Sequence, residues 1–218
     1  MASEPNPAIP AATVVLVRDG TVGLDVLLLR RSDVGAFAGM WVFPGGRVDA
    51  ADPGADDLAR ACSAAVRESV EEIGVVLDPA GLRFWSHWTP PAASPKRFAT
   101  WFFVAEAPDA AVTIDGHEIV EHVWLAPVEA LERNLPMAPP TCVTLHQLAR
   151  FDRVSDVLTL GPPDGVEYFF TNPARVEGGL AMLWHGDAGY ESGDPAAPGA
   201  RHRLTMVGGR RPRYERSV

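Results

Sequence analysis

Three glutamates and one arginine form the group of residues most able to do chemistry. The segment Arg67-Glu-Ser-Val-Glu-Glu-Ile-Gly74 places Glu68, Glu71 and Glu72 at positions i, i+3 and i+4. In an α-helix these positions share one face, so the three carboxylates lie within an arc of about 100°. Like charges this close repel one another and raise the pKa of at least one group. Mg²⁺ or Mn²⁺ relieves this conflict, because such ions bind carboxylate oxygens.

A metal ion held in this way points to hydrolysis at phosphorus. It can bridge phosphate oxygens and lower the pKa of a bound water, which then attacks. The alternative is a solvated charged helix face, which is the common role of such a run. Gly45 and Gly46 before the segment and Gly74 after it favour the metal site, because glycines permit positive φ and a close approach of the backbone.

A helix over residues 57–73 must carry these side chains. Asp56 or Asp57 can cap its start and Gly74 can end it. The glutamates lie on the flank of its apolar stripe, so we expect them to line a cleft. The predicted buried stripe consists of Leu58, Cys62, Ala65, Val66, Ser69 and Ile73.

The remaining elements indicate a chain that mixes strands and helices. Helices are predicted at 127–135 and 140–151. We expect a flexible leader over 1–11, a main domain over 12–150 and a C-terminal extension over 151–218. The extension either packs on the same domain or lies in a homodimer interface. Apolar, β-branched runs predict strands at 12–17, 22–29, 40–43, 82–88, 98–105, 120–125, 166–170, 180–184 and 203–207.

Composition limits the classes of function. Of the 218 residues 47% are hydrophobic and 22% charged, which is typical of a folded globular protein. A net charge of -9 argues against binding to a nucleic acid polymer. A small anionic substrate is compatible with this charge, because a bound cation reverses the local sign. The single lysine, Lys96, and the abundant Ala, Gly and Pro indicate a GC-rich, bacterial genome.

Other features point to a cytoplasmic protein. Cys62 and Cys142 are far apart in the sequence and match no zinc-binding spacing, so we expect reduced thiols. No signal peptide is evident. No apolar run approaches the roughly 20 residues needed to cross a bilayer, so we expect no membrane association.

The chain resembles the Nudix hydrolases, whose box reads Gly-x5-Glu-x7-Arg-Glu-U-x-Glu-Glu-x-Gly-U, with U aliphatic. The resemblance covers roughly residues 12–150. It implies an α/β/α sandwich around a mixed β-sheet, here an α+β fold with a β-rich C-terminal extension. It also implies that Glu68, Glu71 and Glu72 hold Mg²⁺ or Mn²⁺ and that Arg67 orients a glutamate of the box. The matching residues are Gly46, Arg67, Glu68, Glu71, Glu72, Gly74 and Val75.

The box departs from the family pattern in the loop before the helix. Gly46 and Arg67 are 21 positions apart, seven more than in the family. Ala59 stands eight residues before Arg67, where the family has a glutamate. Asp56 or Asp57 can substitute for it, or the role is lost. Asp49 and Asp52 lie beside the predicted site in sequence, but we expect them to be solvated loop acids.

Two segments resemble a subgroup, the type 19 acyl-CoA diphosphatases of peroxisomes and their bacterial relatives. They are Trp41–Asp52 and Thr89–Phe103, although Ala99 stands where we would expect an acid. This resemblance implies a CoA-like substrate, cut to a 3′,5′-ADP and a phosphopantetheine part. One alternative is a pyrophosphatase for ADP-ribose, a dinucleotide or a nucleoside triphosphate. Another is a non-catalytic module that senses a nucleotide, although such a module should tolerate loss of the box glutamates.

Several residues outside the helix are candidates for substrate binding and proton transfer. Glu118 and Glu121 precede the Val123-Trp-Leu125 segment, in a region where Nudix enzymes often place their general base, and Glu118 is our first candidate. Trp85, Trp88, Phe98 and Trp101 either stack on a base or, more commonly, pack in a core. Arg30 and Arg31 either flank the site or are solvated strand ends. Lys96 and Arg97 either contact phosphates or form structural ion pairs. The candidate substrate-binding residues are Arg31, Gly45, Gly46, Lys96 and Arg97.

Overall fold

A mixed sheet of eight strands forms the centre of the computed structural model, which describes residues 7–217. The strands follow the order β3-β2-β1-β6-β5-β8, while β4 pairs with β1 and β7 pairs with β2. The β1–β6 and β5–β8 pairs are parallel and the other pairs are antiparallel. The bounds are β1 Ile9–Asp19, β2 Leu24–Arg31, β3 Trp41–Val42, β4 Gly45–Arg47, β5 Arg83–Thr89, β6 Phe98–Glu106, β7 Ile119–Leu125 and β8 Glu167–Phe170.

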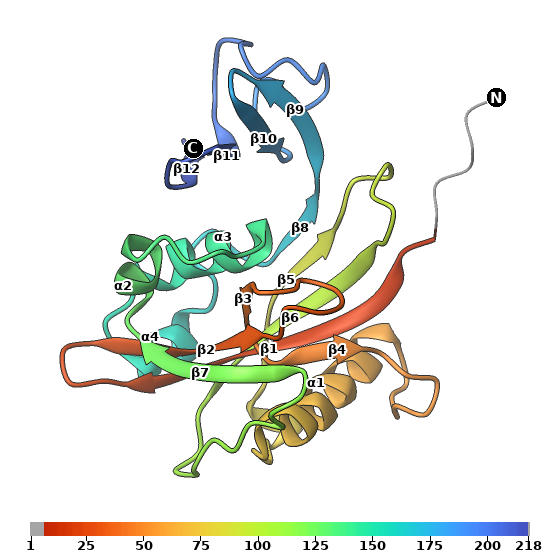
Figure 1. Ribbon diagram of the computed structural model, residues 1–218, viewed down its shortest axis with the longest axis vertical. Coiled ribbons are helices and arrows are strands. Elements are labelled where there is room, and N and C mark those ends of the chain that lie inside the picture. Colours follow the sequence, from red (N-terminus) through yellow and green to blue (C-terminus); the bar gives the residue numbers. More distant parts are fainter. Residues whose placement is uncertain (1–6, 218) are drawn as a thin grey trace.

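Helices cover both faces of this sheet (Figure 1). The long helix α1 (Asp57–Ile73) packs on one face, and α2 (Pro127–Glu132), α3 (Pro139–Leu148) and α4 (Val154–Leu160) pack on the other. The alternation of side chains along β1 explains why both faces are buried. Val14 and Leu16 contact the core under α1, whereas Val15 and Val17 contact the core under the other helices. The predicted α/β/α sandwich with a mixed sheet is confirmed.

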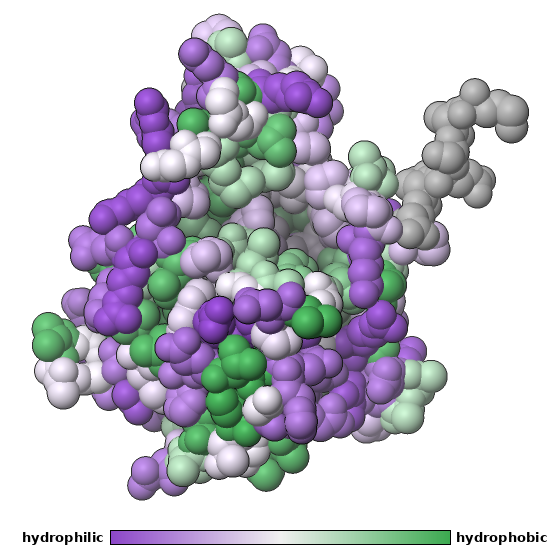
Figure 2. Space-filling view, viewed as in Figure 1, coloured by the Kyte–Doolittle hydropathy of each residue, from purple (hydrophilic) through white to green (hydrophobic). Residues whose placement is uncertain are grey.

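A second, four-stranded antiparallel sheet forms the lobe at the top of Figure 1. Its order is β12-β11-β10-β9, so the C-terminal region is β-rich, as predicted. Trp184 and Leu204 of this lobe belong to the same buried cluster as Trp85 and Leu145 of the main sheet and α3. The molecular surface is hollowed between the lobe and the main sheet (Figure 2). The bounds are β9 Asn172–Val176, β10 Gly179–Leu183, β11 His202–Val207 and β12 Arg213–Arg216.

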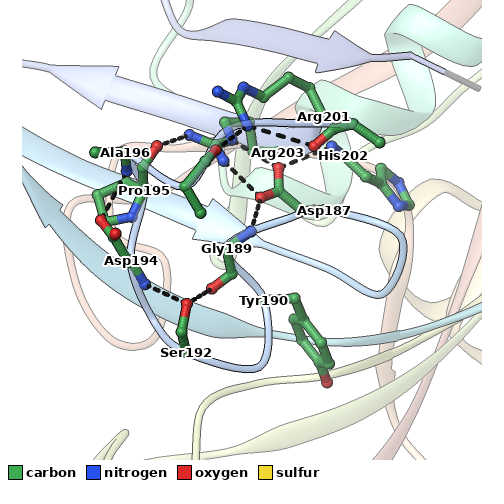
Figure 3. Close-up of polar contacts among 12 residues, drawn as sticks. Asp187, Gly189, Tyr190, Ser192, Asp194, Pro195, Ala196, Arg201, His202 and Arg203 are labelled. Carbon is green, nitrogen blue, oxygen red and sulfur yellow. Dashed lines mark hydrogen bonds and ion pairs between the residues drawn. The ribbon is translucent and has the colours of Figure 1, made fainter.

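A buried ion pair holds the loop between β10 and β11 (Figure 3). The side chain of Asp187 is fully buried and accepts hydrogen bonds from Arg203 Nε (2.7 Å) and Nη2 (2.5 Å). It also accepts from the backbone N–H groups of Gly189 (2.8 Å) and His202 (2.9 Å). Arg203 Nη1 donates to the Pro195 carbonyl at 2.6 Å. Burial raises the pKa of Asp187, but these donors outweigh it and hold the pKa at about 2.

Some elements differ from the sequence-based expectation. β1 begins at Ile9, inside the segment expected to be a flexible leader, because residues 9–11 pair with 98–100 of β6. Residues 1–6 of that leader lie outside the described residues. The buried stripe of α1 is rotated: Ala61 and Ala64 are fully buried, whereas Leu58, Cys62 and Val66 are only partly buried. Small residues face the sheet because α1 lies close against it. No helix among residues 7–217 is long and apolar enough to cross a membrane.

Candidate active site

Helix α1 presents the acidic residues of the site and has the predicted ends. Asp56 caps its start, because the Asp56 side chain accepts a hydrogen bond from Ala59 N at 2.8 Å. Gly74 ends it with a φ of 69°, in the left-handed region that glycine tolerates. Ser69, at the box position that is usually aliphatic, is buried and donates to the Val75 carbonyl at 2.9 Å. This hydrogen bond explains how a hydroxyl is tolerated there.

Glu72 is the most buried acid of the helix, with 5% of its surface exposed. One carboxylate oxygen accepts a hydrogen bond from Gly45 N at 2.9 Å, and the other lies 3.5 Å from Arg31 Nη1. Burial raises the pKa of Glu72 to about 8, although Gly45 and Arg31 act in the opposite direction. The negative charges of Glu68 and Glu118 raise it further. This carboxylate therefore lacks sufficient positive charge around it.

Gly46 makes room for the second acid, Glu68. A Cβ atom on Gly46 would lie 2.3 Å from Glu68 Oε1, and one on Gly45 would lie 2.4 Å from the Ala12 carbonyl oxygen. The expected close approach is therefore present. The expected positive φ is not, because both glycines belong to β4 and pair with β1 in extended conformation. Burial also raises the pKa of Glu68, and Arg67 counteracts this.

Arg67 occupies the centre of a network on the same flank of α1. Its Nη1 donates to Glu68 Oε1 at 2.8 Å and to Glu71 Oε2 at 3.0 Å. Its Nε and Nη2 donate to the two oxygens of Asp52 at 3.0 and 3.2 Å, and Nη2 also donates to the Arg47 carbonyl at 2.8 Å. The guanidinium thus fixes the carboxylates of Glu68 and Glu71 relative to β4.

Asp52 was not expected in this network, and the expectation that it is solvated was wrong. It is buried, and the hydrogen bonds from Arg67 lower its pKa. Asp56 and Asp57, the expected substitutes for the missing box glutamate, lie exposed at the start of the helix. The sequence held one usable signal, which is that Asp52 lies within the loop that is longer than in the family.

Arg31 links the helix to Glu118. Arg31 Nη2 lies 2.7 Å from Glu118 Oε2, while Nη1 faces Glu72. Arg31 Nε is buried and has no hydrogen-bond partner among the described residues. Glu118 itself is largely exposed, with 64% of its side chain accessible, and Asp115 fixes its backbone by accepting from its N–H. Glu121, the other candidate base, is an exposed residue of β7 paired with Arg30 of β2.

Carboxylates outnumber cationic groups in this site. Among the described residues, the six acids named at the end of this paragraph form ion pairs with only two guanidinium groups, those of Arg31 and Arg67. No three acidic, histidine or cysteine side chains of residues 7–217 converge closely enough to hold a metal ion as they stand. The donor chemistry nevertheless fits a hard divalent cation, because buried carboxylates with raised pKa values gain from added positive charge. The six acids are Asp49, Asp52, Glu68, Glu71, Glu72 and Glu118.

The other candidate residues lie elsewhere. Lys96 Nζ is 5.3 Å from the ring centroid of Phe98, and Arg97 Nη2 donates to the Pro90 carbonyl at 3.2 Å. These contacts are in the β5–β6 loop. Strand β6 pairs with one edge of β1, whereas β4, which carries Gly45 and Gly46, pairs with the other edge.

Among the aromatic candidates, Trp85 and Trp88 are core residues, as the more common alternative predicts. Trp88 stacks on Phe169 with ring centroids 3.7 Å apart. Trp101 is half-buried and packs against Phe84, with ring centroids 5.2 Å apart. The half-buried Phe98 has the ring of Phe37 at 6.1 Å. Trp85 and Trp88 are therefore not positioned to stack on a substrate.

The sequence and the fold of this chain have known counterparts. The NUDIX domain family model matches residues 7–145, more than half of the chain. The chain belongs to the Nudix hydrolase family. Its fold is similar to that of a NUDIX hydrolase from Alicyclobacillus acidocaldarius, with a TM-score of 0.65, 23% identity, and coverage of 71% of this chain and 96% of that one.

Two further relatives give context for this Nudix hydrolase. The NUDIX domain of Shewanella oneidensis NrtR, solved in complex with ADP ribose, has a TM-score of 0.54 and 19% identity, covering 66% of this chain and 88% of that one. The acyl-coenzyme A diphosphatase NUDT19 of Gallus gallus is 27% identical over 149 residues. That match covers 62% of this chain but only 39% of the length of the chicken protein.

Proposed function

We propose that this Nudix hydrolase is a metal-dependent diphosphatase that cleaves the diphosphate linkage of a nucleotide derivative, with CoA or an acyl-CoA as the preferred class. The observation that carries the proposal is the excess of carboxylates beside Gly45 and Gly46, two of which, the buried Glu72 and the partly buried Glu68, have raised pKa values. An acidic cluster without compensation is unfavourable in a folded protein unless a cation joins it.

Glu68, Glu71 and Glu72 would hold Mg²⁺ or Mn²⁺. When bound, the ion supplies positive charge to the phosphates and activates water at neutral pH. The Gly45 N–H, 2.9 Å from Glu72, keeps that carboxylate oriented towards β4. Arg67 does the same for Glu68 and Glu71 through Nη1.

Glu118 is our candidate general base. Its exposed carboxylate is held 2.7 Å from Arg31 and can take a proton from the attacking water. Arg31 can also pair with a substrate phosphate, because a guanidinium offers several donors in one plane. We also propose that Lys96 and Arg97, on the β5–β6 loop, bind a more distant phosphate group of the same substrate.

The subgroup resemblance and the likeness to chicken NUDT19 support CoA or acyl-CoA as substrate. The ADP ribose bound to the Shewanella NrtR domain favours the second candidate, an ADP-ribose pyrophosphatase. Both substrates contain a diphosphate that joins an adenosine to a second group. The chemistry at phosphorus is therefore the same, and the candidates differ in what the protein recognises beyond it.

A substrate panel tests the proposal. The full chain is incubated with Mg²⁺ or Mn²⁺ and with CoA, an acyl-CoA, ADP-ribose, NADH or dATP, and the products are identified by mass spectrometry. We expect the highest kcat/KM for CoA or acyl-CoA, with a 3′,5′-ADP product. Faster cleavage of ADP-ribose would favour the second candidate. Binding without turnover of every compound would instead indicate a non-catalytic sensing module.

We further propose a small-molecule partner, no nucleic acid polymer and a cytoplasmic location. The free thiols of Cys62 and Cys142 are compatible with a reducing compartment. Residues 151–218 are proposed to complete the main domain, because β8 extends its sheet and Trp184 enters its core. A homodimer remains a prediction that size-exclusion chromatography with light scattering can test.

A further inference from the structure

The loop between β4 and α1 is attached along the helix rather than extended into solvent. Ser63 Oγ donates to the Pro53 carbonyl at 2.8 Å, and Arg60 Nη2 donates to the Asp49 carbonyl at 3.0 Å. Gly54 lies so close that a Cβ atom there would be 2.4 Å from Arg60 N. The loop that carries the seven additional residues therefore has a defined path beside the first turns of α1.

This path brings the Asp52 carboxylate into contact with the Arg67 guanidinium. The Asp52 side chain is 6% exposed, and its carboxylate also accepts a hydrogen bond from the backbone N–H of Asp49, at 2.7 Å. It then accepts two hydrogen bonds from Arg67, whose remaining terminal nitrogen contacts Glu68 and Glu71. Bidentate pairing fixes the plane of a guanidinium, not only its position.

We propose that Asp52 is a positioning residue for the metal-binding glutamates, acting through Arg67 in place of the glutamate that the Nudix box carries eight residues before its arginine. The inference rests on the proposed function for the roles of Glu68 and Glu71. The additional loop residues would then supply the carboxylate that is missing eight residues before Arg67, where this chain has Ala59. Both Asp52 oxygens accept hydrogen bonds from Arg67, so Asp52 would act without binding the metal ion itself.

The first test measures Mn²⁺ affinity without turnover, by the electron paramagnetic resonance signal of free Mn²⁺. Residues that orient metal ligands typically contribute 10- to 100-fold to metal affinity or activity. We therefore expect Asp52→Asn to weaken Mn²⁺ binding about 10- to 100-fold, because the neutral amide cannot hold Arg67 in the same way. If Asp52→Asn does not fold, Arg67→Lys tests the second step of the same argument, since it keeps the charge but loses the planar donor group, and unchanged Mn²⁺ affinity in Arg67→Lys would also overturn the proposal.

The matched control is Asp56→Ala, which removes the N-cap of the same helix without touching Arg67. A purely structural effect would appear in both variants as a lower Tm with unchanged Mn²⁺ affinity. The second test is a double-mutant cycle. If Asp52 acts through Arg67, the double variant Asp52→Asn/Arg67→Lys binds Mn²⁺ no more weakly than Arg67→Lys alone.

Each outcome decides the proposal. Unchanged Mn²⁺ affinity in Asp52→Asn, or fully additive effects in the double variant, would overturn it. Failure of the wild-type protein to bind Mn²⁺ would overturn both this proposal and the proposed function. Wild-type protein that binds Mn²⁺ but hydrolyses none of the diphosphates would refute the proposed function alone, because the role of Asp52 is still measured through binding.

Discussion

Two groups of arginines and carboxylates in this protein differ in the balance between negative and positive charge. In the C-terminal lobe, one carboxylate (Asp187) meets one guanidinium (Arg203) and two backbone N–H groups, and its pKa falls to about 2. Beside α1, two guanidinium groups meet six carboxylates, and the pKa of Glu72 rises to about 8. Both regions are partly or fully buried, so burial alone does not explain the difference.

The comparison separates a structural ion pair from a site prepared for a cation. A buried carboxylate with all its acceptors used has no reason to recruit another ligand. A group of acids with too few donors keeps an unfavourable interaction that a divalent ion can remove. Charge balance, rather than burial or the number of ion pairs, therefore marks the candidate active site.

The largest expected effect is that of Glu72→Gln. Turnover should fall by at least about 10³-fold, because a neutral amide cannot replace a carboxylate in holding a divalent cation. The Tm of the metal-free variant should equal or exceed that of the wild type, since the neutral amide avoids the free-energy cost of burying this carboxyl group, which must otherwise stay charged or take up a proton on folding. Mn²⁺ should raise the Tm of the wild type and not that of the variant. Near-normal rates would remove Glu72 from the metal site.

The Asp187–Arg203 ion pair should respond to Arg203→Met in the opposite way, with a loss of stability and little loss of activity. Removing one partner leaves the Asp187 carboxylate buried without its cation, which typically costs about 3 to 5 kcal/mol. Urea unfolding should show this loss, whereas the kcat of the remaining folded protein should stay within about twofold. A variant as stable as the wild type would show that the pair contributes little to stability.

Glu118→Gln should give an intermediate effect. If Glu118 is the general base, kcat should fall about 10²-fold or more, with little change in KM. Glu121→Gln is the matched control, because Glu121 is an exposed acid three residues further along the chain, within β7. An unchanged rate for Glu118→Gln together with a slow Glu121→Gln enzyme would transfer the role of base to Glu121.

The smallest expected effect is a loss of stability in acid. The pKa of Asp187 lies below its ordinary value of 3.8, at about 2, so the ionised form stabilises the folded state. This contribution is complete above about pH 4 and is lost as the pH falls towards 2, amounting to roughly 2 kcal/mol. Unfolding free energies measured between pH 5 and 2 should therefore change less in Asp187→Asn than in the wild type. Parallel pH curves for the two proteins would contradict this.

The helix of the site could be predicted from the sequence because its signals are local. The spacing of Glu68, Glu71 and Glu72 and the glycine at its end depend only on neighbouring residues. The role of Asp52 could not be predicted, since a loop acid has no period and its partner, Arg67, is 15 residues away. Strand β4 also escaped prediction, because it contains two glycines and exists only through its pairing with β1.

Helix α4 shows the same limit more clearly. It is short, and the side chain of its N-cap residue, Arg153, makes no capping hydrogen bond. The Val154 N–H instead donates to Asp19, at the end of β1, at 2.9 Å. A contact between residues 135 positions apart in the chain leaves no trace in the local pattern.

The membership of Trp184 and Leu204 in the central core has a consequence for biosynthesis. On the ribosome, residues 7–145 emerge first, while β8 and the lobe that completes the core are still to be made. Until then the sheet lacks its outer strand, and apolar surface around Trp88, including the face later stacked by Phe169, stays open to solvent. Such surface promotes association between nascent chains. Molecular chaperones are therefore expected to matter most for this protein in the short interval before Leu204 leaves the exit tunnel.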